Sequence, residues 1–508
     1  MSITSVIKSI QDIMRKDAGI DGDAQRLGQM SWLLFLKIFD AQEEDLEFEL
    51  DDYTAPIPEK YLWRNWAADE EGMTGDELLG FINDEVFNDL KNLTAPIDLN
   101  PRGFVVRAAF SDAFNYMKNG TLLRQVINKL NEIDFSDSKE RHLFGDIYEQ
   151  ILKDLQSAGN AGEFYTPRAV TQFMVNRINP QLGEKVFDPA CGTGGFLACS
   201  MDHLLKQKKT PQDHETIQKQ IYGVEKKQLP HLLCTTNMLL HGIEVPVQIK
   251  HGNTLAKPLA NWDEDEQVDV IVTNPPFGGT EEDGIEKNFP SEFQTRETAD
   301  LFLQLIIEVL KENGRAAVVL PDGTLFGEGV KTKIKKLLTE ECNLHTIMRL
   351  PNGVFNPYTG IKTNILFFTK GTPTKDIWFY EHPYPRGVKN YNKTKPMKFE
   401  EFQTEIDWWG NEADGFATRV ETKQAWKVSI DEVIKRNFNL DIKNPYVEEV
   451  ISHDPDELLA KYAQQQEGIQ GIRSQLKDIL SDALDGTQSC NSAKSQGTQS
   501  TSSAKSGE

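Results

Sequence analysis

The stretch Val268-Asp269-Val270-Ile271-Val272-Thr273-Asn274-Pro275-Pro276-Phe277 decides the fold. Its first six residues are mostly β-branched and apolar, which predicts a strand buried on both faces of a sheet. Proline cannot donate a hydrogen bond to a neighbouring strand, so the two prolines end the strand and stiffen the loop that follows. We therefore expect a sheet with a rigid loop at the carboxyl end of this strand.

The loop Asn274-Pro275-Pro276-Phe277 has the chemistry to hold a planar amine. The Asn274 side-chain oxygen and the Pro275 carbonyl can accept both hydrogens of an exocyclic NH2 group, and Phe277 can stack on the ring that carries it. Two acceptors would localise the nitrogen lone pair and aim it at an electrophile without a strong base. We therefore interpret Asn274, Pro275, Pro276 and Phe277 as catalytic.

Short apolar runs alternate with helical stretches on both sides of this strand. The seven runs are 185–187, 221–224, 247–249, 268–272, 316–320, 346–350 and 364–368. Such alternation is typical of crossover units that build a parallel sheet with helices on both faces. The sequence therefore predicts an α/β fold with a doubly wound, mostly parallel, seven-stranded sheet.

The rest of the chain divides by composition. Residues 1–155 carry apolar side chains at helical spacing and predict an all-helical N-terminal domain, followed by the catalytic domain at 156–370. A mixed segment rich in Trp, Tyr, Pro and Lys spans 371–453. A helix is expected at 454–485, docking either on a partner or on the chain's own body. Residues 486–508 lack large apolar side chains and predict a disordered tail.

Charge and cysteine content limit the class of protein. The 508 residues carry 55 Lys and Arg against 78 Asp and Glu, a formal charge of −23, so the chain needs help to bind a phosphate backbone. The five cysteines show no zinc-ligand spacing, which favours a reducing cytoplasm and no metal. No signal peptide opens the chain, and the apolar window 30–39 is too short to span a membrane.

A glycine-rich turn follows the first predicted strand, in Phe187-Asp188-Pro189-Ala190-Cys191-Gly192-Thr193-Gly194-Gly195-Phe196-Leu197. Glycines let the backbone turn tightly and approach a ligand at the carboxyl end of the strand. The turn differs from dinucleotide and P-loop fingerprints, and Asp188 suits an ammonium or sulfonium ligand better than an anion. Glu225 ends the second strand, where a carboxylate can hold the two hydroxyls of a ribose.

Together these motifs resemble those of S-adenosylmethionine-dependent amino-methyltransferases that act on adenine N6. The stretch Gly162-Glu163-Phe164-Tyr165-Thr166-Pro167-Arg168 is similar to the cofactor-capping motif of the modification (M) subunit of type I restriction-modification systems. The resemblance implies S-adenosyl-L-methionine as cofactor, with Asn253 at its adenine ring. The implied cofactor-binding residues are Glu163, Phe164, Tyr165, Thr166, Pro167, Arg168, Asp188, Gly192, Thr193, Gly194, Gly195, Glu225 and Asn253.

The resemblance also implies partners. These are double-stranded DNA with a flipped target base, a specificity (S) subunit that reads the sequence, a restriction (R) motor-nuclease subunit and a second copy of the chain. The acid-free basic run 386–398 is either a DNA-backbone contact or a solvated loop. Three alternatives stay open: a self-sufficient N6-adenine DNA methyltransferase, a glutamine-amide methyltransferase and an inactive assembly scaffold.

Overall fold

The computed structural model describes residues 3–111, 113–133, 166–356, 359–392 and 395–446, and, further along, 459, 462, 465–466, 469–477 and 479. The chain forms two compact units, 1–446 and 447–508. In the second unit, residues 469–477 are helical and exposed, while most of the predicted helix 454–485 and the tail 486–508 lie outside the described residues. Among the described helices, none is long and apolar enough to cross a membrane.

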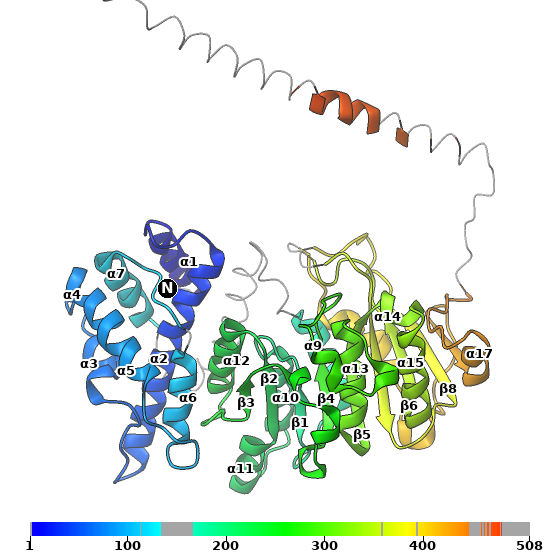
Figure 1. Ribbon diagram of the computed structural model, residues 1–508, viewed down its shortest axis with the longest axis horizontal. Coiled ribbons are helices and arrows are strands. Elements are labelled where there is room, and N and C mark those ends of the chain that lie inside the picture. The colour runs from blue at the N-terminus through cyan, green and yellow to red at the C-terminus, as the bar shows by residue number, and fades with distance from the viewer. Residues whose placement is uncertain are drawn as a thin grey trace, which may run out of the picture. The chain divides into compact units, whose positions relative to one another are not determined.

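The described residues up to 133 are helical, with no strand, as their apolar spacing predicts (Figure 1). Asn100 and Asn119 cap two of these helices by accepting hydrogen bonds from backbone N–H groups of the first turn. Large rings, among them Trp32, Phe35 and Phe39, fill the core between the helices. The helical elements are α1 (Ile3–Met14), α2 (Asp23–Glu49), η1 (Glu59–Tyr61), α3 (Trp63–Trp66), α4 (Gly75–Gly80), the π-helical η2 (Phe81–Val86), α5 (Phe87–Lys91), α6 (Pro101–Phe110) and α7 (Gly120–Asn131).

Among the described residues, the part of the chain after the N-terminal helices is built on one sheet of nine strands in the order β3-β2-β1-β4-β5-β7-β6-β8-β9. The pairs β3–β2, β2–β1, β1–β4, β4–β5 and β6–β8 are parallel, and β5–β7, β7–β6 and β8–β9 are antiparallel. The strands are β1 (Val186–Asp188), β2 (Ile221–Glu225), β3 (Ile249–His251), β4 (Val268–Thr273), β5 (Leu310–Pro321), β6 (Cys342–Arg349), β7 (Thr363–Lys370), β8 (Asp376–Glu381) and β9 (Ala425–Ser429).

The predicted α/β fold is confirmed, but the predicted count of seven strands was wrong. The seven apolar runs are β1 to β7, and β8 and β9 come from the segment 371–453 that we expected to be mixed. The sheet needs them because β6 would otherwise present an unpaired edge. The Phe379 and Trp426 rings stack at 5.4 Å between centroids and hold the added pair together. The predicted domain boundaries stay predictions.

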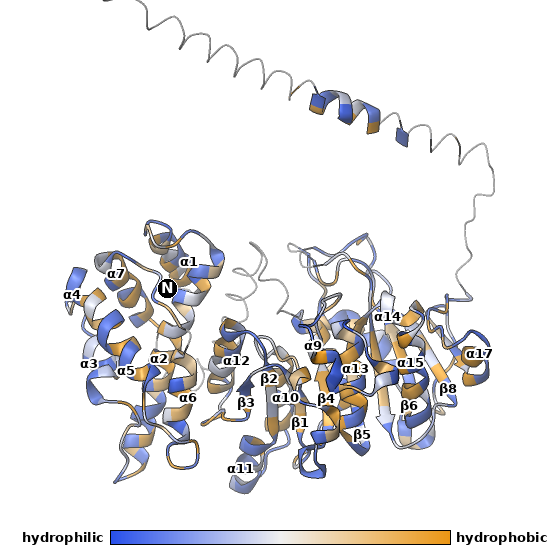
Figure 2. Cartoon of the chain, viewed as in Figure 1, coloured by the Kyte–Doolittle hydropathy of each residue, from blue (hydrophilic) through white to orange (hydrophobic). Residues whose placement is uncertain are grey.

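Helices cover both faces of the sheet, because successive side chains of each strand point to opposite sides. Val270 and Val272 of β4 join one apolar core and Ile271 joins the other. Figure 2 shows apolar residues gathered on the strands and on the helices beside them. The α-helices are α9 (Arg168–Ile178), α10 (Gly195–Leu205), α11 (Pro211–Gln220), α12 (Gln228–Leu240), α13 (Thr298–Val309), α14 (Asp322–Phe326), α15 (Val330–Glu341), α16 (Gln403–Trp408) and α17 (Ile430–Lys435). The 3-10 turns are η4 (Thr254–Ala256), η5 (Leu259–Asn261), η6 (Glu264–Glu266), η7 (Ile285–Asn288), η8 (Ser291–Phe293), η9 (Phe399–Phe402) and η10 (Glu412–Asp414).

Helix α12 belongs to two cores at once. Its Leu232, Leu233, Leu239 and Leu240 pack into the core of the N-terminal helices. Its Cys234 and Met238 pack into the core of the sheet, next to the glycine-rich turn. Polar contacts reinforce the first of these interfaces, since Gln42 Nε2 donates to the Leu239 carbonyl at 3.2 Å. The N-terminal helices and the sheet therefore share a helix.

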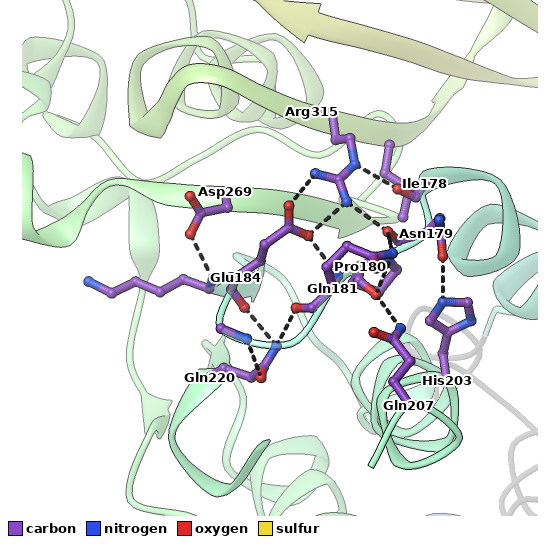
Figure 3. Close-up of polar contacts among 12 residues, drawn as sticks. Ile178, Asn179, Pro180, Gln181, Glu184, His203, Gln207, Gln220, Asp269 and Arg315 are labelled. Atoms are coloured by element: carbon purple, nitrogen blue, oxygen red, sulfur yellow. Dashed lines mark hydrogen bonds and ion pairs between the residues drawn. The ribbon is translucent and has the colours of Figure 1, made fainter. Parts of the chain in front are cut away.

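A polar network closes the amino ends of the central strands, as Figure 3 shows. The Arg315 guanidinium donates to both carboxylate oxygens of Glu184, at 2.8 and 2.7 Å. It also donates to the carbonyls of Ile178 and Asn179, both at 2.7 Å, at the end of α9. This network ties α9, β1 and β5 together at the end of the sheet away from the predicted site.

Candidate active site

The predicted site residues meet at the carboxyl ends of three neighbouring strands. Asp188 ends β1, Glu225 ends β2 and Asn274 follows β4, and these strands lie side by side in the sheet. They line a cavity of about 100 Å³. The lining residues are Thr166, Asp188, Ala190, Cys191, Gly192, Thr193, Gly195, Phe196, Glu225, Lys226, Lys227, Asn274 and Pro276.

The glycine-rich turn forms one wall of the cavity. Gly192 and Gly194 have φ angles of 53° and 82°, a conformation that favours glycine. A Cβ atom on Gly194 would lie 2.7 Å from Cys234 Sγ of α12, so the turn packs closely on that helix. The turn is also tied to β2, because Cys191 N donates to the Val224 carbonyl at 3.0 Å. The backbone conformation of the turn and its packing on α12 therefore determine the position of this cavity wall.

Asp188 is buried with one carboxylate oxygen engaged and the other without a partner among the described residues. Its Oδ1 accepts hydrogen bonds from Thr273 Oγ1 at 2.6 Å and from Ala190 N at 3.1 Å. Its Oδ2 is buried and has no hydrogen-bond partner in the part of the chain that the structure describes. The pKa of Asp188 is raised to about 7, mainly by burial and in smaller part by the nearby Glu225 carboxylate. A cationic ligand would supply the missing partner.

Glu225 is held in place by the backbone around it. Its Oε2 accepts from Gly192 N at 2.9 Å and its Oε1 accepts from Lys227 N at 2.7 Å. Burial raises its pKa, while these two hydrogen bonds lower it. Each oxygen keeps a second lone pair, which can accept a hydroxyl of a ligand.

Asn274 is oriented by a residue 108 positions earlier in the chain. Its Nδ2 donates to Thr166 Oγ1 at 2.9 Å. Its Oδ1 is buried and has no hydrogen-bond partner among the described residues. Because the two ends of an amide differ, anchoring the NH2 group leaves the oxygen as the group available to a donor in the cavity.

The other residues of the proline loop flank this amide. Pro275 is buried and Pro276 is exposed and lines the cavity. Phe277 is half-buried, and its ring lies edge-on to Phe355 at 5.9 Å between centroids. Phe355 itself is buried, so it supports the position of the Phe277 ring.

The remaining predicted residues fall into three groups. Glu163, Phe164 and Tyr165 lie outside the described residues. Pro167 precedes α9, and Arg168 pairs with Asp202 of α10 at 2.7 Å and is not among the residues that line the cavity. Asn253 lines a neighbouring cavity of about 400 Å³, and its Nδ2 donates to Glu281 Oε2 at 3.2 Å.

Several lining residues were not predicted from the motifs. Ala190, Cys191 and Phe196 belong to the glycine-rich stretch, whose quoted length already contained them. Lys226 and Lys227 directly follow Glu225. Their position at the end of a predicted strand could have indicated that they line the cavity. Lys226 Nζ pairs with Glu281 at 3.1 Å, which brings the turn after β2 to the loop after β4. Among the described residues, no group of three or more His, Cys, Asp or Glu side chains could hold a metal ion.

Comparisons with known proteins agree with this geometry. Residues 139–454 match the N-6 DNA Methylase family, and residues 3–130 match the HsdM N-terminal domain. The type I restriction enzyme EcoEI methylase subunit of Escherichia coli is 80% identical over 492 residues, which cover 97% of this chain and 100% of the relative. The StySPI methylase subunit of Salmonella potsdam is 30% identical, over 81% of this chain and 77% of the relative.

Solved structures give the same result. A protein described as a modification subunit of a type I restriction enzyme from Vibrio vulnificus YJ016 is 45% identical, with a TM-score of 0.79, and the match covers 89% of this chain and 98% of that one. A structure from a study of type I restriction-modification complex assembly is 37% identical, with a TM-score of 0.78, over 95% and 98% of the two chains. The chain belongs to the methylase subunits of type I restriction enzymes, and its activity is the methylation of adenine N6 in DNA.

Proposed function

We propose that the cavity binds S-adenosyl-L-methionine and that Asn274 and Pro275 present the N6 amine of a flipped adenine to it. One observation carries this assignment: the anchored Asn274 amide leaves a buried oxygen, without a partner among the described residues, at the wall of the same cavity that holds Asp188. Asn274 Oδ1, which can accept a hydrogen bond from an amine, and the Asp188 carboxylate, which can bind a cation, therefore lie in one cavity.

The residues of the cavity fit this cofactor. The Asp188 oxygen that has no partner among the described residues suits its cationic amino-acid part, and so does the turn Gly192, Thr193, Gly194 and Gly195, of which all but Gly194 line the cavity. The Glu225 carboxylate suits its ribose hydroxyls. Asn253 is assigned to the adenine ring. Glu163, Phe164, Tyr165, Thr166, Pro167 and Arg168 are assigned to the outer wall by the capping motif. S-adenosylmethionine supplies a methyl group activated by a sulfonium centre.

The chain contributes orientation and electrostatics to the transfer. Asn274 Oδ1 and the Pro275 carbonyl accept the two N6 hydrogens, which directs the lone pair into the cavity and stabilises the positive charge that develops on the nitrogen. Phe277 stacks on the flipped ring and offsets part of the unstacking cost, a few kcal/mol. Pro276 keeps the loop rigid.

The partners are proposed from charge and from the family. A formal charge of −23 disfavours sequence reading by this chain alone, so we assign that reading to a specificity subunit. We further propose that two copies of the chain assemble with it, that a restriction motor-nuclease subunit joins for cleavage, and that the segment 454–485 docks on a partner. The apolar side chains of this segment that the structure describes, such as Ile472 and Leu476, are exposed.

The test is methylation of unmethylated duplex DNA by the chain alone and with a specificity subunit, with transfer of labelled methyl groups as the readout. We expect activity only in the mixture, and activity of the chain alone would support a self-sufficient enzyme instead. Asn274→Ala and Phe277→Ala should abolish transfer while calorimetry shows unchanged binding of S-adenosylhomocysteine. Full activity in the Asn274 variant would overturn the catalytic assignment.

A further inference from the structure

The basic run 386–398 emerges from the same end of the sheet as the catalytic loop. β8 is parallel to β6, β6 and β5 both run antiparallel to β7, and β5 is parallel to β4, so β4 and β8 end at one edge. The residues that follow β8 therefore start at the edge where Asp188, Glu225 and Asn274 lie. Figure 1 shows yellow loops rising above this end of the strands. We call residues 384–398 the basic loop.

The described part of the basic loop is anchored to the protein rather than free in solvent. Tyr391 is 2% exposed and its hydroxyl donates to Glu401, and Met397 is 5% exposed. The Tyr384 hydroxyl donates to the Asn352 carbonyl at 2.9 Å, so both ends of the loop are fixed. A merely solvated loop would not bury these side chains.

The same anchors connect the basic loop to the catalytic loop. Asn356 Nδ2 donates to the Tyr391 carbonyl at 3.0 Å. Gly353, at φ 81°, approaches Tyr391 so closely that a Cβ atom there would lie 2.5 Å from the same carbonyl oxygen. Phe355, in the turn between them, makes the edge contact with Phe277. The turn 353–356 therefore contacts both the basic loop and Phe277, the residue whose ring we expect to stack on the flipped base.

Three charges of the basic loop have no acidic partner in the part of the chain that the structure describes. Arg386, Lys389 and Lys395 are exposed, and none of them makes an ion pair with a described residue. The sequence from 382 to 399 contains no Asp or Glu, although the whole chain carries −23. Several other cations of the chain do pair with acids, as Lys331 does with Asp300 at 2.6 Å. An unpaired basic surface on an acidic protein fits an anionic partner.

We propose that the basic loop binds the phosphate backbone of the duplex next to the flipped adenine, through Arg386, Lys389 and Lys395. This inference rests on the proposed function, because it places the duplex at the opening beside Asn274. The rigid anchoring then sets where the duplex lies relative to the cavity, while the base sequence is read elsewhere. The contact is electrostatic, so it releases counterions and depends on salt.

The experiment compares two triple variants in the complex with the specificity subunit. Arg386→Gln, Lys389→Gln and Lys395→Gln remove three charges from the basic loop. Lys206→Gln, Lys208→Gln and Lys209→Gln remove three exposed charges just after α10, at the opposite edge of the sheet, as the matched control. The affinity for a duplex carrying the recognition sequence, defined by methylome mapping, is measured by fluorescence anisotropy at several salt concentrations with S-adenosylhomocysteine present.

In the loop variant, the slope of log affinity against log salt should become shallower by about 3 for each copy of the chain that touches the duplex, and the affinity at about 0.1 M salt should fall tenfold or more. The control should keep the wild-type slope. Calorimetric binding of S-adenosylhomocysteine should be unchanged in both variants, which shows that the cavity is intact.

An unchanged slope in the loop variant would overturn the proposal. Loss of assembly with the specificity subunit in the absence of DNA, measured by mass photometry, would also overturn it and assign the loop to a protein contact. These outcomes differ from failure of the proposed function, which would appear as full methylation by Asn274→Ala in the wild-type loop background.

Discussion

Thr273 Oγ1 donates a hydrogen bond of 2.6 Å to Asp188 Oδ1, which joins the last residue of β4 to the last residue of β1. Thr273 immediately precedes Asn274, and Asp188 carries a buried oxygen, Oδ2, for which the described residues provide no partner. The hydrogen bond favours the ionised carboxylate and so lowers the pKa that burial raises. The loop that we propose to be catalytic and the carboxylate of the cavity are therefore linked by one hydroxyl group.

Stability without cofactor should fall as pH rises from about 4 to about 7. The pKa of Asp188 is about 7 in the folded chain, against roughly 4 when unfolded, so the folded state holds a proton that the unfolded state releases in this window. Asp188→Asn removes this loss and should be about 2 to 4 kcal/mol more stable than wild type at pH 8, with little difference at pH 4.5. Urea unfolding at both pH values measures it. An equal difference at the two pH values would contradict the assignment.

The same group should control cofactor affinity in the opposite direction. The proposed cationic ligand needs ionised Asp188, so binding of S-adenosylhomocysteine, whose amino-acid part is also cationic, should tighten as pH rises through about 7. Calorimetric titration of the wild type between pH 6 and 8 measures this, and Asp188→Asn should show weak binding with a flat profile. A wild-type affinity independent of pH would show that Asp188 does not contact the ligand's charge.

Thr166→Val should slow transfer without weakening cofactor binding. Valine keeps the shape of threonine but cannot accept from Asn274 Nδ2, so the amide can turn and present a donor to the amine. We expect kcat to fall about tenfold or more, with Thr166→Ser retaining most of it. Single-turnover rates at saturating cofactor, with calorimetric affinities, separate the two effects. Weaker cofactor binding at a normal saturated rate would contradict the orienting role and leave Thr166 only as part of the cavity wall.

Gly223→Ala should displace the glycine-rich turn. A Cβ atom there would lie 2.7 Å from Leu197 Cδ1 and 3.0 Å from Cys191 Sγ, both in buried residues of the turn and α10. We expect about 1 to 3 kcal/mol of lost stability and weaker S-adenosylhomocysteine binding. Gly252→Ala, where a Cβ atom would meet nothing within 4 Å, is the matched control and should resemble wild type in both measurements. Equal behaviour of the two variants would show that the turn tolerates the shift.

Arg315→Ala should destabilise the fold and spare the reaction. It leaves Glu184 and two carbonyls without their donor at the amino edge of the sheet, which should cost about 2 to 4 kcal/mol. Lys311→Ala breaks the neighbouring, more exposed pair with Asp269 and should cost less than about 1 kcal/mol. Urea unfolding measures both, and transfer at low temperature should match wild type. A large loss of methyl transfer in folded Arg315→Ala would show that contacts at the amino edge of the sheet affect the site at the carboxyl edge.

The sequence predicted the parts of the fold that local pattern encodes. β4 and β7 are runs of β-branched and aromatic residues buried on both faces, so they were recognisable. β8, with Ile377-Trp378-Phe379-Tyr380, is also a buried apolar run, but it was missed because it lies in a segment rich in Trp, Tyr, Pro and Lys. Its neighbours in the sheet are β6, which ends at Arg349, and β9, which begins only at Ala425. Neither neighbour is adjacent in the sequence, so local pattern does not reveal the pairing.

The site was predictable to the extent that strand ends determine it. Asp188, Glu225 and Asn274 come together because parallel strands end at one edge, which the order of the motifs already indicated. The Thr166 to Asn274 hydrogen bond was not predictable, since it joins residues 108 positions apart. The same holds for Asn253, whose amide bonds to Glu281 in a loop that no motif marked.

The double membership of α12 means that the helical domain cannot be trimmed away. A shortened protein lacking the first 133 residues would expose Leu232, Leu233, Leu239 and Leu240 to water, on the helix whose Cys234 supports Gly194. Such a fragment would be prone to aggregate, and any tilt of the N-terminal helices would move α12 and with it the glycine-rich turn of the cavity that we propose for S-adenosylmethionine.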